Sequence, residues 1–238
     1  MPLLRDIQLL VPNNKDVNSQ FFSETRCMVS FYNRLLPRIK LKEDKGIVIN
    51  CVNTLQEIAS TDSDSYIIFN YIPVFVEIDI DNFFLLPTNQ EKKKYTLDIL
   101  NRGMIKFAEQ HNYDKEVFEN VYNKIIELNY NNTHIFNKKV SPNRKYTCAV
   151  IYEHDVDYID VYLEIIRNNK KGIINRERIF RYKDNDEQDL LSEFGEIVWT
   201  LNHKVTFSGF YNNERYIITF IEERENRPLY WKLEKQRL

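Results

Sequence analysis

The spacing of apolar residues changes twice along this chain, and that change constrains the fold more than any other feature of the sequence. Residues 1–87 contain short runs rich in β-branched and aromatic side chains, which predict strands. Residues 88–129 instead carry apolar side chains three and four positions apart, which predicts two helices in a hairpin. Residues 141–238 return to alternating runs. Strands segregated from helices in this way predict an α+β fold with antiparallel β-sheets.

The N-terminal runs predict strands that share β-branched and aromatic composition. They are Ile7–Val11, Arg26–Asn33, Arg38–Leu41, Gly46–Val52, Tyr66–Tyr71 and Val74–Asp81. The helical hairpin is predicted to begin at Thr88, which with Glu91 matches a capping box. Its second helix carries one apolar stripe that includes Phe118, Val121 and Ile125.

The last hundred residues predict a β-β-β-α-β-β unit. Its strands are predicted at Lys145–Glu153, Asp157–Ile166, Ile173–Tyr182, Val205–Tyr211 and Arg215–Glu222. The helix between them is expected to start at Asp184 or Asp186 and to continue to Leu201. Tyr130–Ser141 is the predicted linker, and an ordered segment is the alternative because it contains Ile135 and Phe136. We therefore expect a β-rich subdomain at 1–130 that ends in the helical hairpin and an α+β subdomain at 141–238, unless both form one continuous domain.

The composition fits an ordinary globular protein with a substantial core. The 238 residues are 43% apolar and 13% aromatic, and the net charge is only −2. This balance disfavours nucleic acid as a partner, and no apolar run has the length of a membrane-spanning helix. Three dispersed cysteines, Cys27, Cys51 and Cys148, match no disulfide framework, which predicts a cytoplasmic protein. Frequent Asn, Ile, Lys, Tyr and Phe indicate AT-rich codons and a bacterial or phage source.

Well-marked catalytic motifs are missing from the sequence. The five glycines, Gly46, Gly103, Gly172, Gly195 and Gly209, lie too far apart to build a phosphate-binding loop. There is no His-Glu-x-x-His metal motif, no Gly-x-Ser-x-Gly motif and no Cys-x-x-Cys motif. These absences disfavour most enzyme classes that are defined by short motifs.

Three acidic residues follow Phe75 in alternation with apolar residues. On a strand this alternation places their side chains on one face: Glu77, Asp79 and Asp81. A hard cation, Mg²⁺ or Mn²⁺, would relieve the repulsion between these carboxylates. An apolar strand that ends in Asp-x-Asp resembles the metal-holding strand of polymerase palms, of archaeo-eukaryotic-type primases and of some glycosyltransferases. The alternative is a solvent-facing strand whose acids pair with nearby lysines and arginines.

A second alternation follows residue 157. It places two tyrosines and two acids on one strand face: Tyr158, Asp160, Tyr162 and Glu164. Tyrosines are enriched at protein interfaces, and acidic groups beside them would steer a basic partner. This face is therefore a predicted protein interface. The alternatives are that the helix from Asp186 covers both tyrosines, or that they are ordinary half-buried strand tyrosines.

Three functions remain open from the sequence. The first is a protein-binding protein without catalysis or cofactor, whose size, acidic patches and β-rich architecture are similar in general character to those of bacterial immunity and antitoxin proteins. The second is a metal-dependent phosphoryl or nucleotidyl enzyme that uses Glu77, Asp79 and Asp81 with Mg²⁺ or Mn²⁺. The third is a subunit of a larger assembly. The lack of catalytic motifs favours the first.

Overall fold

The computed structural model describes residues 3–237 except 5, 13, 42–45, 57–70, 170–171, 185, 210–212 and 222–229. The chain divides into two compact units. The first comprises Met1–Asn132 with Asp155–Asp157, and the second comprises Thr133–His154 with Tyr158–Leu238. Helices and antiparallel sheets are both present, so the predicted α+β class is confirmed. Among the helices of the described residues, none has the length and apolar character that crossing a bilayer would require.

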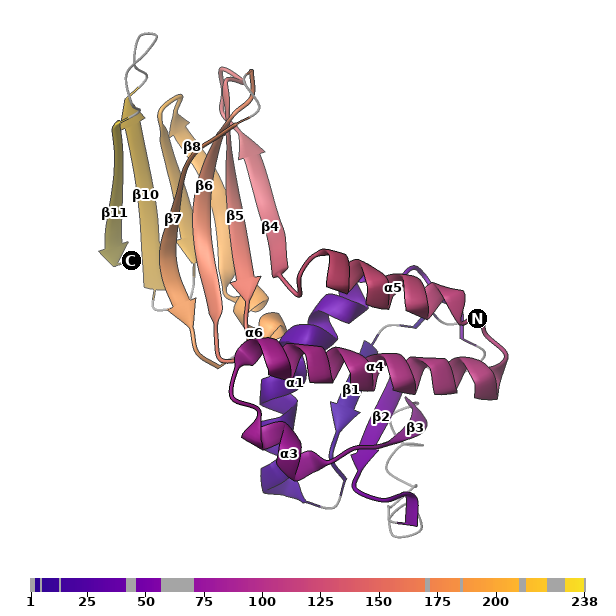
Figure 1. Cartoon of the computed structure of the whole chain (residues 1–238). Coiled ribbons are helices and arrows are strands. Elements are labelled where there is room, and N and C mark those ends of the chain that lie inside the picture. Colours follow the sequence, from indigo (N-terminus) through magenta and orange to yellow (C-terminus); the bar gives the residue numbers. More distant parts are fainter. Residues whose placement is uncertain are drawn as a thin grey trace. The chain divides into compact units, whose positions relative to one another are not determined.

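A three-stranded parallel sheet forms the centre of the first unit (Figure 1). Its strands are β1 (Asp6–Leu10), β2 (Gly46–Val52) and β3 (Tyr71–Glu77), in that order. Every residue of β2 is buried, as expected for the central strand of a parallel sheet covered on both faces. This sheet departs from the predicted antiparallel pairing, because β1 and β2 are joined by a helical crossover, and such a connection aligns strands in parallel.

That crossover contains α1 (Lys15–Leu35), so the predicted strand Arg26–Asn33 is wrong. The Asn14 side chain caps the helix by accepting a hydrogen bond from the amide of Val17 at 3.2 Å. The buried positions include Phe21, Thr25, Met28 and Tyr32, which are spaced for one face of a helix. The aromatic and β-branched run around Val29 suggested a strand, but the helical spacing extends over a longer segment and prevails.

Two other predicted N-terminal strands differ from the structure. Within Arg38–Leu41, only Lys40 pairs, through an isolated bridge to Leu3. The strand predicted at Val74–Asp81 ends at Glu77, and α3 (Ile80–Leu85) begins three residues later. In the predicted strand Tyr66–Tyr71, residues 66–70 lie outside the described residues, and Tyr71 begins β3.

The predicted helical hairpin is confirmed by α4 (Asn89–His111) and α5 (Glu116–Glu127). The Thr88 hydroxyl caps α4 by accepting from the Glu91 amide at 3.2 Å, the first bond of a capping box, and it donates to the Glu91 carboxylate at 2.6 Å. Helix α4 packs closely on β2 at Gly103. A Cβ atom there would lie 2.5 Å from Cδ1 of Ile49, so the Ile49 side chain would have to shift to make room for any larger residue.

The second unit is a sandwich of two four-stranded antiparallel sheets (Figure 1). One sheet contains β4 (Asn132–Val140), β5 (Tyr146–His154), β6 (Ile159–Arg167) and β7 (Gly172–Tyr182). The other contains β8 (Phe194–Leu201), β9 (Lys204–Gly209), β10 (Glu214–Ile221) and β11 (Tyr230–Arg237). Their facing side chains form one apolar core, in which the rings of Tyr146 and Phe220 lie 4.9 Å apart.

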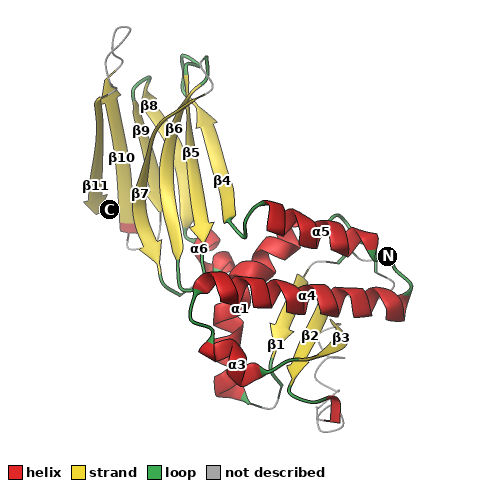
Figure 2. Ribbon diagram, in the orientation of Figure 1, coloured by secondary structure: helices red, strands yellow, loops and turns green. Residues whose placement is uncertain are grey.

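Two segments of this unit differ from the leading predictions. The helix that starts after Asp186 is only α6 (Glu187–Ser192), and the segment to Leu201 is strand β8 (Figure 2). Asp186 caps α6 as predicted, but the run Ile197–Thr200 is β-branched and aromatic and pairs with β9. Most of the predicted linker Tyr130–Ser141 is strand β4, whose Phe136 packs on Phe194 across the sandwich.

We predict that Gly103→Ala destabilises the first unit, although alanine favours a helix by about 1 kcal/mol over glycine. The new methyl group would collide with Ile49, and overpacking of this kind costs about 1–3 kcal/mol. The free energy of unfolding, measured by urea denaturation, should fall. In an Ile49→Ala background the same glycine substitution should cost less. An equal cost in both backgrounds would show that Ile49 is not the limiting contact.

Candidate functional site

The three acids of the first predicted site do not share a strand face. Glu77 is the last residue of β3, whereas Asp79 is the N-cap of α3 and Asp81 lies in its first turn. The Asp79 carboxylate accepts a hydrogen bond from the Asn82 amide at 2.9 Å. Asp79 thus has a local structural role, since a carboxylate at an N-cap satisfies an unpaired helix amide.

The strand that suggested a metal site therefore ends at Glu77, before Asp79 and Asp81. All three acidic side chains are exposed, where water screens their mutual repulsion. Among the described residues, no three His, Cys, Asp or Glu side chains gather closely enough to hold a metal ion. No geometric observation supports Mg²⁺ or Mn²⁺ at Glu77, Asp79 and Asp81.

The second predicted site does lie on one face of a sheet. Ile159, Val161 and Leu163 of β6 point into the sandwich core. Because side chains alternate along a strand, the opposite face carries Tyr158, Asp160, Tyr162 and Glu164. The alternative that α6 covers the tyrosines is wrong, because Leu190 of α6 packs into the core on the other side of the sheet. Both tyrosines are half-buried, as the other alternative predicts.

Asp160 is the centre of this face. Only 4% of the residue is exposed, and its carboxylate accepts hydrogen bonds from Nε and Nη2 of Arg181, both at 2.7 Å. Arg178 donates to the same carboxylate at 3.3 Å. Burial by itself would raise the pKa of Asp160, but the hydrogen bonds from Arg181 and Arg178 outweigh it and hold the pKa below its ordinary value.

A β-bulge brings the second of these arginines onto the face. Tyr162 pairs with Arg178 and the preceding residue Val161 pairs with Phe180, so Ile179 is an extra residue in β7. In a regular strand with Arg178 on the outward face, Phe180 would also point outward and Arg181 would point inward. Because of the bulge, Phe180 packs against the core and Arg181 reaches Asp160.

Both tyrosines are covered by guanidinium groups. The Cζ atom of Arg181 lies 3.5 Å from the ring centroid of Tyr158, and that of Arg176 lies 4.1 Å from the ring centroid of Tyr162. Arg176 also donates to Glu153 of β5 at 2.7 Å. We call the set Tyr158, Tyr162, Arg176, Arg178 and Arg181 the Arg–Tyr face.

Glu164 differs from Asp160 although both are buried on the same side of β6. Glu164 is 5% exposed, and no hydrogen bond to its carboxylate is found in the described part of the chain. Burial raises its pKa above the ordinary value, and the nearby Arg176 offsets this only in part. The two acids of the predicted interface are therefore not available to attract a basic partner, and the exposed charges around them belong to the arginines and to Glu153, whose side chain is 41% exposed.

His154, which lies between two acidic residues in the sequence, is also buried. Its side chain is fully buried at the end of β5, with Nδ1 3.3 Å from Oε2 of Glu187. Tyr152 donates to the other oxygen of Glu187 at 2.5 Å. This cluster ties α6 to β5 and is closed to solvent at the histidine, which is typical of a structural role.

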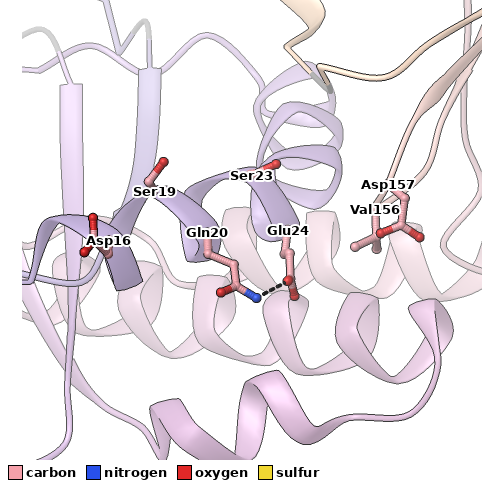
Figure 3. Close-up of a pocket in the computed structure, with 7 residues that line it drawn as sticks. All are labelled: Asp16, Ser19, Gln20, Ser23, Glu24, Val156 and Asp157. Carbon is pink, nitrogen blue, oxygen red and sulfur yellow. Dashed lines mark hydrogen bonds between the residues drawn. The ribbon is translucent and has the colours of Figure 1, made fainter.

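A cavity of about 520 Å³ lies beside α1 in the first unit (Figure 3). Its lining consists of Asp16, Ser19, Gln20, Ser23 and Glu24 with Val156 and Asp157. Glu24 is paired with Lys92 and accepts from Gln20 at 2.8 Å, and Asp157 accepts from Asn89 at 2.9 Å. Two of its three carboxylates thus already have partners, which reduces their attraction for a cationic ligand.

We predict that Asp160→Asn lowers the free energy of unfolding by about 1–3 kcal/mol at neutral pH, because hydrogen bonds between charged groups are lost. A carboxyl group whose pKa is lowered on folding stabilises the protein above its unfolded pKa, here 3.8, and this contribution disappears as pH falls through the folded pKa. Denaturant melts from pH 7 downward should show the gap between wild type and variant closing below about pH 4. A gap that persisted at low pH would contradict the assigned ion pairs.

Glu164→Gln should have the opposite effect. A carboxyl group whose pKa is raised on folding stabilises the protein below its unfolded pKa, here 4.5, and this contribution is lost as pH rises through the folded pKa. Removing the charge should therefore raise the melting temperature at pH 7 and change it little well below pH 4.5. A lower melting temperature at pH 7 would mean that the ionised Glu164 is well paired by Arg176.

No protein-family model, curated protein or solved structure matches this chain. Its function must therefore follow from its own side chains.

Proposed function

We propose that this chain is a protein-binding protein without catalytic activity, and that it binds its partner on the Arg–Tyr face. The observation that carries the proposal is the ordered pairing of Tyr158 with Arg181 and of Tyr162 with Arg176 on one outward face of a sheet. Tyrosine and arginine are among the residue types that contribute most to binding energy at protein interfaces. Here they are adjacent and partly exposed.

The rigidity of the face supports this proposal. Arg181 is fixed by two hydrogen bonds to Asp160, and Arg176 is fixed by Glu153 and by the ring of Tyr162. Ordering a long side chain at an interface costs about 0.5–1.5 kcal/mol, and this cost is already met when the side chain is held in the free protein. The face therefore offers large side chains that lose little freedom when a partner binds.

Comparison with the other functions also favours binding. A metal-dependent phosphoryl or nucleotidyl enzyme rested on Glu77, Asp79 and Asp81 sharing one strand face, and β3 ends at Glu77. The proposal includes a cytoplasmic location, for which the three buried free thiols are favourable. A bacterial or phage immunity or antitoxin protein would be one such binder, and a subunit of an assembly would use the same face.

The test is capture of a partner from an extract of the native host, followed by affinity measurements with the purified pair. We expect a stoichiometric complex, and we expect Tyr162→Ala to weaken it by about 30-fold, the effect of losing one central interface residue. The matched control is Ile221→Ala, which removes an apolar side chain that is 55% exposed on β10 of the opposite sheet.

The control variant should bind like the wild type, and thermal melts should show that both variants are folded. If Tyr162→Ala binds the captured partner as tightly as the wild type does, the interface lies elsewhere. If no stoichiometric partner is captured, the binding function itself loses its support.

A further inference from the structure

Arg178 has the most accessible cationic group of the Arg–Tyr face. Its side chain is 52% exposed, against 39% for Arg181 and 31% for Arg176. In the described part of the chain, its one hydrogen bond is the 3.3 Å contact with Asp160. A guanidinium carries five N–H donors, so Arg178 keeps most of its donors for a ligand.

We infer that Arg178 is the anchor for a carboxylate side chain of an acidic segment on the partner protein, an inference that rests on the proposed function. A guanidinium binds a carboxylate through two parallel hydrogen bonds, and such charge-assisted pairs are about twice as strong as neutral ones. The incoming carboxylate would replace water around Arg178. The two shorter bonds between Arg181 and Asp160 would stay intact.

The neighbours of Arg178 favour this occupant. Arg178 lies opposite Tyr162 in the sheet register, and Arg181 and Tyr158 lie farther along the same face. The partner's acidic side chain would therefore be flanked by aromatic rings that exclude water and by two further guanidinium groups. Asp160 and Glu164 are buried, and the partly exposed Glu153 is already paired with Arg176, so the most accessible charge that a partner meets here is that of Arg178.

The same charges argue against nucleic acid as the occupant. Arg176, Arg178 and Arg181 are balanced locally by Glu153, Asp160 and Glu164, and the whole chain has a net charge of −2. Nucleic-acid binding depends on a basic surface that neutralises several phosphates at once. A locally balanced face is suited to contacts at short range with individual carboxylates, as at a protein interface.

The experiment uses the full chain and defined probes. Fluorescence anisotropy at low salt would measure binding of a short labelled polyglutamate peptide, a polylysine peptide of the same length and a single-stranded oligothymidylate. We expect the polyglutamate peptide to bind best. We expect Arg178→Glu to weaken its binding by about tenfold or more, because attraction becomes repulsion.

Arg215→Glu is the matched control, since it makes the same charge change at an exposed position of β10 on the opposite sheet. It should leave peptide binding nearly unchanged. Arg178→Gln removes the charge without reversing it and serves if Arg178→Glu fails to fold. Arg178→Gln should also weaken peptide binding.

Three results would overturn the inference: no preference for polyglutamate over polylysine, equal loss of binding in Arg178→Glu and Arg215→Glu, or oligothymidylate binding as tight as that of the acidic peptide and equally dependent on Arg178. The last result would identify a general anion site. If the host partner is still captured and still lost in Tyr162→Ala, the proposed function survives and only the carboxylate anchor is wrong. If capture also fails, the proposed function fails with it.

Discussion

The outward face of β6 and β7 depends on one buried carboxylate. Asp160 is nearly inaccessible to water, so its charge must be matched within the protein, and Arg178 and Arg181 supply that match. Once Arg181 is held there, its guanidinium lies over Tyr158. A single acid on a strand thus sets the positions of two arginines and one aromatic ring, and so determines the surface that a partner would meet.

A backbone irregularity makes that arrangement possible. In regular alternation, Arg178 and Arg181 would lie on opposite faces of β7, and a guanidinium would point into the apolar core. The extra residue Ile179 shifts the register by one position, so Phe180 packs inward and Arg181 points outward. The sequence of this strand requires the bulge, because without it the charge of Arg181 would be buried and the ring of Phe180 would be exposed.

Part of this organisation could be predicted from the sequence. The hairpin of α4 and α5 and the strands β5 and β6 have long, regular apolar periods, and local sequence was enough to place them. Helix α1 was missed because its aromatic and β-branched run also fits a strand, and β8 was missed because the spacing of Ile197 and Leu201 also fits a helix. These ambiguities are resolved only by tertiary pairing, which a single sequence does not display.

The charge of the Arg–Tyr face could not be predicted from the sequence either. Alternation correctly placed Tyr158, Asp160, Tyr162 and Glu164 together, but it suggested an acidic surface. The character of a surface depends on which charges remain exposed after pairing, and here the neighbouring strand places arginines above the acids. Asp160 has two arginine donors, whereas Glu164 lies opposite Arg176, which donates to Glu153 instead. The ionised Asp160 therefore stabilises the fold, whereas the ionised Glu164 destabilises it. Because the arginines of β7 lie beside the acids of β6, a run of acids in the sequence becomes a surface that carries guanidinium groups and aromatic rings.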